Sequence, residues 1–143
     1  MYLWDANILR HFAEGHPTLR NHLLQIPWAE IALPSVVLAE ALRGRCDFAL
    51  KATPVQAPLA HQQLVKTQQL LQQFNLVIFD QAAAQVMTEL QRKVKSRKRY
   101  ADVMIAAMAL AGNHTVVTRN QTHFADLLPP RQLANWIDDP PAR

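Results

Sequence analysis

The feature that most constrains this chain is a series of short apolar segments that alternate with longer helical ones. The apolar runs at residues 1–4, 30–33, 76–79 and 115–117 fit buried strands, and a fifth strand is expected within residues 133–137. Strands that alternate with helices favour a parallel sheet covered on both faces. We therefore predict an α/β fold around a central, mainly parallel sheet of about five strands.

The length and cysteine content limit the kind of protein further. The 143 residues suit one domain spanning 1–143, and a chain that is 50% hydrophobic and 18% charged is not a disordered one. The single cysteine, Cys46, excludes an internal disulfide and favours a reducing compartment. Because no signal peptide or bilayer-spanning run is visible, we expect a cytoplasmic protein without a membrane partner.

The positive charge of the chain is concentrated in one place. Six of the fifteen Lys and Arg residues lie within residues 92–99, and the remaining nine face eleven acidic residues. A dense basic patch favours a polyanionic partner such as a nucleic acid. The alternative is a solvated helix end, because cations stabilise helix C-termini.

Three acidic residues occupy positions that would normally face the protein interior. Asp102 shares its helical stripe with apolar side chains, and Glu40 follows two β-branched residues at spacings of three and four. Asp5 directly follows the first strand, and Thr118 and Asn120 follow the fourth. In a right-handed parallel sheet these positions can converge at the edge where the strands end, which is the edge that binds ligands.

Carboxylates that are forced together repel one another, so they share protons or bind a cation. A set of oxygen ligands without His or Cys selects Mg²⁺ or Mn²⁺ rather than zinc. Such an ion lowers the pKa of a bound water and neutralises charge on a phosphodiester. The three acids therefore predict metal-dependent hydrolysis.

Each polar residue also has a purely structural alternative. Asp5 suits an N-cap, and Glu40 could extend out of its helix face or pair with Arg43. Asp102 could cap its own helix, and Asn120 is a common turn residue. Capping or solvation explains the remaining acids considered, which are Asp80, Asp126, Asp138 and Asp139. The joint pattern of the inward-facing acids favours function over these separate explanations.

The sequence also predicts the limits of the helix that carries Glu40. Ser35 is expected to be its N-cap, because it follows a proline at the end of a strand. Arg43 and Gly44 are expected to end it, and residues 46–58, which contain two prolines, are expected to form a loop.

Four motifs follow one another over nearly the whole chain. They are YLWDANIL around Asp5, LPSVVLAEALRG around Glu40, YADVMIAAMAL around Asp102 and VVTRNQTHF around Asn120. With these motifs the chain resembles the PIN-domain family, and specifically the VapC-type toxin ribonucleases of type II toxin-antitoxin systems. The resemblance implies a three-layer α/β/α fold and an endoribonuclease that depends on Mg²⁺, or on Mn²⁺ as a substitute.

The resemblance also implies residue roles. The implied catalytic residues are Asp5, Glu40, Asp102, Thr118 and Asn120. The first three would hold the metal and orient the attacking water. The family often has an acid at the position of Asn120 and a threonine at that of Ala6. An amide can ligate through its oxygen but supplies no charge, so a second metal would bind weakly.

The same resemblance implies partners. These toxins form homodimers, are neutralised by a VapB-type antitoxin, and often cut structured RNAs such as tRNA. Residues expected to contact the RNA backbone are Arg97, Lys98, Arg99 and Arg119.

Two other functions remain open at this stage. One is a Mg²⁺-dependent phosphohydrolase that forms an aspartyl phosphate on Asp5, although Asn7 stands where haloacid-dehalogenase-like enzymes carry a second Asp. The other is a catalytically inactive PIN module that binds RNA or a protein partner. Such a module would bind RNA with strong salt dependence and would not cleave it.

Overall fold

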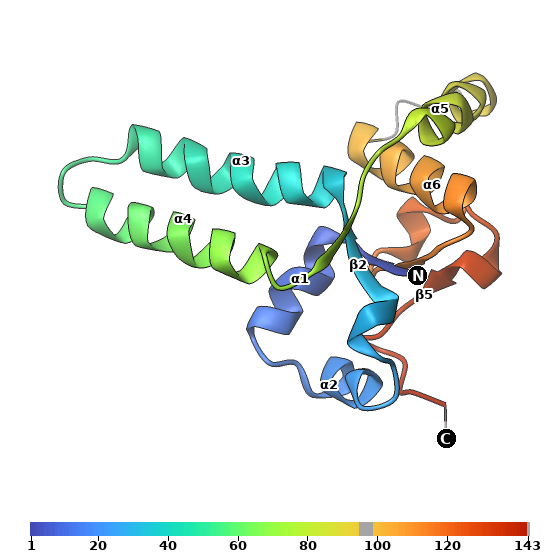
Figure 1. The fold of residues 1–143 in the computed structure, drawn as a ribbon, viewed down its shortest axis with the longest axis horizontal. Coiled ribbons are helices and arrows are strands. Elements are labelled where there is room, and N and C mark those ends of the chain that lie inside the picture. Colours follow the sequence, from blue (N-terminus) through green and yellow to red (C-terminus); the bar gives the residue numbers. More distant parts are fainter. Residues whose placement is uncertain (95–98, 143) are drawn as a thin grey trace.

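The computed structural model describes residues 1–94 and 99–142, and within them the chain forms a five-stranded sheet and six α-helices (Figure 1). The strands are β1 (Tyr2–Trp4), β2 (Ile31–Pro34), β3 (Asn75–Val77), β4 (Thr115–Val117) and β5 (Leu133–Ala134). Their order in the sheet is β3-β2-β1-β4-β5, and every neighbouring pair is parallel. The predicted parallel α/β sheet is therefore confirmed.

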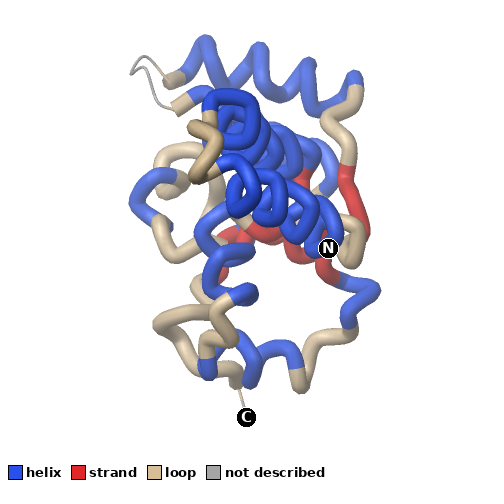
Figure 2. The backbone as a smooth tube through the Cα atoms, turned by 90° about the vertical axis from the view of Figure 1, so that its left-hand side faces the viewer, coloured by secondary structure: helices blue, strands red, loops and turns tan. Residues whose placement is uncertain are grey.

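Helices cover both faces of this sheet, and the strands lie among them in Figure 2. The α-helices are α1 (Ala6–Ala13), α2 (Pro17–Leu23), α3 (Ser35–Lys51), α4 (Ala57–Leu71), α5 (Gln81–Lys93) and α6 (Tyr100–Gly112). Short 3-10 segments are η1 (Trp28–Glu30), η2 (Gln121–His123) and η3 (Pro130–Gln132). The architecture is a three-layer α/β/α fold. No helix in the described ranges is long and apolar enough to cross a bilayer.

The centre of the sheet positions the site. Strands β1 and β4 are neighbours, with Trp4 opposite Val117, and the amide of Asp5 extends the ladder by donating to the carbonyl of Val117 at 3.0 Å. From β1 the chain proceeds to β2 on one side, and β4 joins on the other. Strand order therefore reverses between β1 and β4, and the crevice at such a switch point is where open α/β sheets bind ligands.

Strand β1 is held firmly by the core. Leu3 and Trp4 are fully buried, and the Trp4 ring packs on Phe12 and Phe74 with centroid distances of 5.4 and 5.3 Å. These contacts join β1 to α1 and to the segment after α4. Asp5, the residue that follows β1, is therefore held in place by a well-packed strand.

Helix α3 is longer than the sequence indicated. It continues past Arg43 and Gly44 to Lys51, so the predicted end is wrong, and the predicted loop at 46–58 shrinks to residues 52–56. The added turns are stabilised by packing against α4, and Arg45 donates to Thr67 and Gln63 across the helix pair at 3.1 and 3.0 Å. Figure 1 shows α3 and α4 as a hairpin that extends away from the sheet.

The predicted cap of α3 is also wrong. Pro34 occupies the N-cap position, and Ser35 is the first helical residue. The Ser35 hydroxyl instead accepts a hydrogen bond from the amide of Phe79 at 2.9 Å, which ties the segment after β3 to the start of α3.

Other helix limits agree with the sequence. Asp80 caps α5 by accepting from the amide of Ala83 at 2.9 Å, as predicted. Asn113 ends α6 in the left-handed conformation, with φ of 53°. The strands are displaced or shorter than predicted, because Glu30 belongs to η1, β3 begins at Asn75, and β5 ends at Ala134.

Candidate active site

Asp5 is both a helix cap and part of a tertiary network. Its Oδ1 accepts from the amide of Ala6 at 2.8 Å, so the capping interpretation is confirmed. Its Oδ2 accepts from the hydroxyl of Thr118 at 2.9 Å and from the amide nitrogen of Asn7 at 3.0 Å. The side chain is nearly buried, and its two oxygens have different surroundings.

Thr118 is the centre of this network. It is fully buried, donates to Asp5, and accepts from the Asn7 side chain at 3.2 Å and from the backbone amide of Asn120 at 3.0 Å. The Asn7 oxygen in turn accepts from the amide of Arg119 at 3.1 Å. The loop after β4 is thereby fixed to the junction of β1 and α1.

Asp102 lies in the first turn of α6 and is only 5% exposed. Arg99 occupies the N-cap position, so the interpretation of Asp102 as the cap of its helix is wrong. Asp102 Oδ2 accepts from Arg99 Nε at 3.1 Å, and His123 Nδ1 lies 3.6 Å from the same oxygen. Arg99 Nη2 also lies 2.6 Å from His123 Nδ1.

Glu40 reaches the same region from α3. Within the described chain no ion pair shorter than 4 Å joins it to Arg43, although the charge of Arg43 lowers its pKa. A cavity of about 290 Å³ opens at the switch point, and the residues that line it are Asp5, Ala6, Asn7, Arg10, Glu40, Arg99, Ala101, Asp102 and Asn120. The structure thus brings together the three predicted acids and Asn120. We call this space the acidic cavity.

The carboxylates in the acidic cavity perturb one another. Burial raises the pKa of Asp5 and the charge of Asp102 adds to this, while hydrogen bonds from Thr118 and Ala6 lower it in part. Burial also raises the pKa of Glu40, and the negative charges of Asp5 and Asp102 raise it further. A bound cation would relieve this repulsion.

The donor set suits a hard divalent cation, because it consists of carboxylates and amide oxygens without a thiolate. Across residues 1–94 and 99–142, however, no group of three or more His, Cys, Asp or Glu side chains is already arranged to hold a metal. At Asp102, Oδ2 already accepts a hydrogen bond from Arg99. A metal and Arg99 would therefore compete for this oxygen.

The basic residues predicted to contact RNA have different positions. Arg97 and Lys98 lie outside the described residues. Arg99 lines the acidic cavity, whereas Arg119 donates to both oxygens of Asp138 at 3.1 Å each. Hydrogen bonds from Asn135 and Arg119 hold the pKa of Asp138 below its usual range. Asp138 is therefore more than a solvated acid, because it anchors the chain end to the loop after β4.

Sequence reasoning missed three residues of the site, Asn7, Arg10 and His123. Asn7 and Arg10 stand two and five residues after Asp5. Their place in the helix that starts directly after the first strand was a usable signal for both. His123 reaches Asp102 from η2, far along the chain. Only the tertiary structure places it there.

Comparison with known proteins places this geometry in a family. The sequence profile of the PIN domain matches residues 2–127. No curated protein sequence matches the chain significantly.

Several solved structures share the fold. VapBC2 from Rickettsia felis, bound to a DNA fragment from its promoter, aligns at 26% identity and a TM-score of 0.71 over 94% of this chain and 98% of that one. FitAcB from Neisseria gonorrhoeae aligns at 23% identity and a TM-score of 0.70, over 97% of this chain and 100% of that one. A toxin-antitoxin complex from Klebsiella pneumoniae aligns at 23% identity and a TM-score of 0.68, over 95% of this chain and 98% of that one. With the profile covering most of its length, the chain belongs to the PIN-domain family.

Proposed function

We propose that this protein is a metal-dependent endoribonuclease and the toxin of a VapBC-type toxin-antitoxin pair. The observation that carries the proposal is the convergence of Asp5, Glu40 and Asp102 on one cavity at the switch point of the sheet. Toxins of this family are generally nucleases, and they generally use divalent metal ions. The reaction is hydrolysis of an RNA phosphodiester that leaves a 5′-phosphate on the downstream fragment and a 3′-hydroxyl on the other.

The residues of the acidic cavity have distinct parts in this proposal. Asp5, Glu40 and Asp102 would hold Mg²⁺, or Mn²⁺ as a substitute, and Asn120 would offer a neutral oxygen. The bound ion supplies Lewis-acid stabilisation of the phosphate and a lowered pKa for its water. Thr118 fixes the direction of the Asp5 carboxylate through their 2.9 Å hydrogen bond.

Arg99 supplies the positive charge at the mouth of the site. Arg99 lines the acidic cavity, and its side chain is 63% exposed. Its guanidinium can therefore turn from Asp102 to an incoming phosphate. Such contacts position an RNA backbone without reading its sequence.

The proposed partners follow from the structural neighbours. The Klebsiella pneumoniae structure is a toxin-antitoxin complex, and the Rickettsia felis structure is a VapBC pair on promoter DNA. For this chain we propose a cognate antitoxin, a homodimeric toxin, and a structured RNA substrate such as tRNA.

The test is cleavage of total tRNA by the purified protein with Mg²⁺ and with EDTA. Asp5→Asn and Asp102→Asn should each cut at least roughly 100-fold more slowly, the usual scale for losing one charge-stabilising group. Asp47→Asn is the matched control, because it removes a carboxylate from the exposed side of α3. Circular dichroism checks that all three variants fold.

Each result separates the candidate functions. Cleavage by Asp5→Asn and Asp102→Asn at the parent rate would make the site assignment wrong. Salt-sensitive RNA binding by the parent without cleavage would support the inactive module. Phosphate trapped covalently on Asp5 would support the phosphohydrolase.

A further inference from the structure

A second, larger cavity lies beside the acidic cavity. Its volume is about 530 Å³, and it is formed by α3, by the start of α6 and by the segment after β3. Three residues, Glu40, Arg99 and Ala101, line both cavities. When one group of a ligand lies in the acidic cavity, the next group of the same ligand therefore reaches the mouth of the second cavity.

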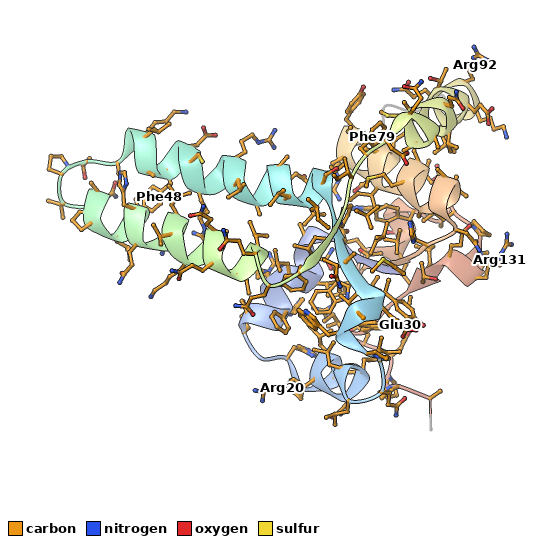
Figure 3. The ribbon with its side chains drawn as sticks, in the orientation of Figure 1. Arg20, Glu30, Phe48, Phe79, Arg92 and Arg131 are labelled. Atoms are coloured by element: carbon orange, nitrogen blue, oxygen red, sulfur yellow. The ribbon has the colours of Figure 1, made fainter. Side chains whose placement is uncertain are left out.

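The walls of the second cavity are mainly apolar and include two aromatic rings. Val36, Met104 and Phe79 contribute apolar surface, and Tyr100 stands at the first position of α6. We call this space the aromatic pocket. In Figure 3, Phe79 is labelled on the segment that leads from β3 to α5, where it passes the start of α3.

The two rings of the aromatic pocket differ in their freedom. The backbone of Phe79 is fixed by its 2.9 Å hydrogen bond to the Ser35 hydroxyl, and the ring is half-buried. Tyr100 is 64% exposed, and its ring contacts no other aromatic ring among the described residues. An unstacked aromatic face beside an apolar wall is a suitable surface for a planar ligand.

Two arginines and one acid, Glu40, line the aromatic pocket. Arg99 lines both cavities and pairs with Asp102. Arg43 extends from α3 and forms no ion pair shorter than 4 Å in the described chain, although its charge lowers the pKa of Glu40. The Ser35 hydroxyl accepts from the amide of Phe79, and most of the exposed lining of the pocket is apolar. Cations around an aromatic, apolar pocket match a phosphate backbone that carries an unpaired base.

We propose that the aromatic pocket binds one unpaired nucleobase of the RNA, adjacent to the scissile phosphate. The base stacks on Tyr100 against the wall formed by Phe79, and Arg43 contacts a neighbouring phosphate. The inference rests on the proposed nuclease function and adds that the nucleotide beside the scissile phosphate is unpaired. Because stacking needs no particular base edge, the pocket tolerates different bases.

The first test measures stacking without catalysis. An RNA hairpin with 2-aminopurine in its loop is titrated with the protein in EDTA, and stacking is read as a decrease in fluorescence. Tyr100→Ala should bind about 10-fold more weakly and lose the quenching, in line with the usual contribution of one base-aromatic stack. Tyr100→Phe should behave as the parent does. Leu50→Ala, at an 82% exposed position far along α3, is the control.

The second test measures the phosphate contact. Arg43→Ala should reduce the slope of log K against log salt by about 0.7, the value for one phosphate contact on a single strand. Arg45→Ala removes the same charge from the same helix, but Arg45 faces α4 through Thr67 and Gln63. Its slope should equal that of the parent.

The outcomes distinguish this inference from the function on which it rests. If Tyr100→Ala binds and quenches like the parent while tRNA is still cleaved, the pocket assignment is wrong and the nuclease stands. If Tyr100-dependent quenching occurs in a protein that cleaves no RNA, the pocket stands and the nuclease fails. If Tyr100→Ala no longer binds an antitoxin but still binds RNA like the parent, the pocket is a protein-binding site and the inference is overturned.

Discussion

A single buried hydroxyl organises the candidate site at the scale of the residue. Thr118 has no exposed surface, yet it makes three polar contacts, two with the start of α1 and one with the loop after β4. Such a buried network is sensitive to the loss of any one member, because the remaining polar groups cannot form a replacement hydrogen bond with water. The orientation of the Asp5 carboxylate therefore depends on a residue that need not touch the substrate.

Replacement of this hydroxyl gives a direct prediction. Thr118→Val keeps the shape but leaves the Asp5 and Asn7 polar groups with one partner fewer, which should cost about 1–3 kcal/mol in the free energy of unfolding. We expect kcat for RNA cleavage to fall about 10-fold, with KM nearly unchanged. Thr118→Ser keeps the hydroxyl and should retain most of the activity. Equal activity of the Val and Ser variants would contradict the positioning role.

Glu40 provides a prediction about pH. Burial and the charges of Asp5 and Asp102 raise its pKa, so the folded chain favours the protonated form. This contribution to stability is fully present below the pKa of an unfolded glutamate, about 4.3, and is lost as pH rises through the higher folded pKa.

Glu40→Gln should therefore be more heat-stable than the parent at pH 7 in EDTA. We expect a rise in Tm of roughly 2 °C, kept small because solvent screens a partly exposed carboxyl. The difference should disappear near pH 4. Thermal melts by circular dichroism from pH 4 to pH 8 measure it, and a constant difference at every pH would show that charge is not the cause.

At the scale of the element, α3 shows how packing overrides local signals. Arg43 and Gly44 are typical of a helix end, and the prolines at 54 and 58 suggest a loop. The helix, Ser35–Lys51, nevertheless continues for seven residues beyond Gly44, since α4 packs alongside. Gly44 lacks a positive φ, so the helix gains nothing from a glycine there.

Gly44→Ala should consequently stabilise the protein. An added Cβ meets no atom within 4 Å, and alanine in a helix interior is better than glycine by about 1 kcal/mol. We expect Tm to rise by about 3 °C in thermal melts. Gly15→Ala is the contrasting variant, because Gly15 has φ of +75° and alanine there should lower Tm. A lower Tm for Gly44→Ala would mean that α3 ends earlier than described.

At the scale of the whole molecule, the reversal of strand order collects residues from distant parts of the chain. Asp5 follows β1, Glu40 extends from α3, and Asp102 lies in α6, yet all three line one cavity. Folding therefore brings together negative charges that would separate in the unfolded chain. A cation that binds them should stabilise the fold as a whole.

Metal binding should accordingly appear as a thermal shift. Mn²⁺ at about 100 times its dissociation constant should add about 2.7 kcal/mol to the free energy of unfolding of the parent. The shift should be much smaller for Asp102→Asn and unchanged for Asp47→Asn, whose residue is exposed on α3. Differential scanning fluorimetry with Mn²⁺ and with EDTA measures the difference. A full shift in Asp102→Asn would remove this residue from the metal site.

Local patterns were sufficient for much of the fold. Short apolar runs fit strands that are covered on both faces, and alternation with helices specifies parallel pairing. The caps at Asp5 and Asp80 were also readable, since capping is a contact between near neighbours. The end of α3 was not readable, because it depends on packing against a helix that comes later in the chain.

The sequence by itself determined which acids could converge on the candidate site and which elements carry them. The tertiary structure alone decided how the cations are used. It paired Arg99 with Asp102 and Arg119 with Asp138, brought His123 to the site, and opened the aromatic pocket beside it. The physical reason is range, because local sequence sets backbone conformation, whereas ion pairs and cavities form between residues that only the folded sheet makes neighbours.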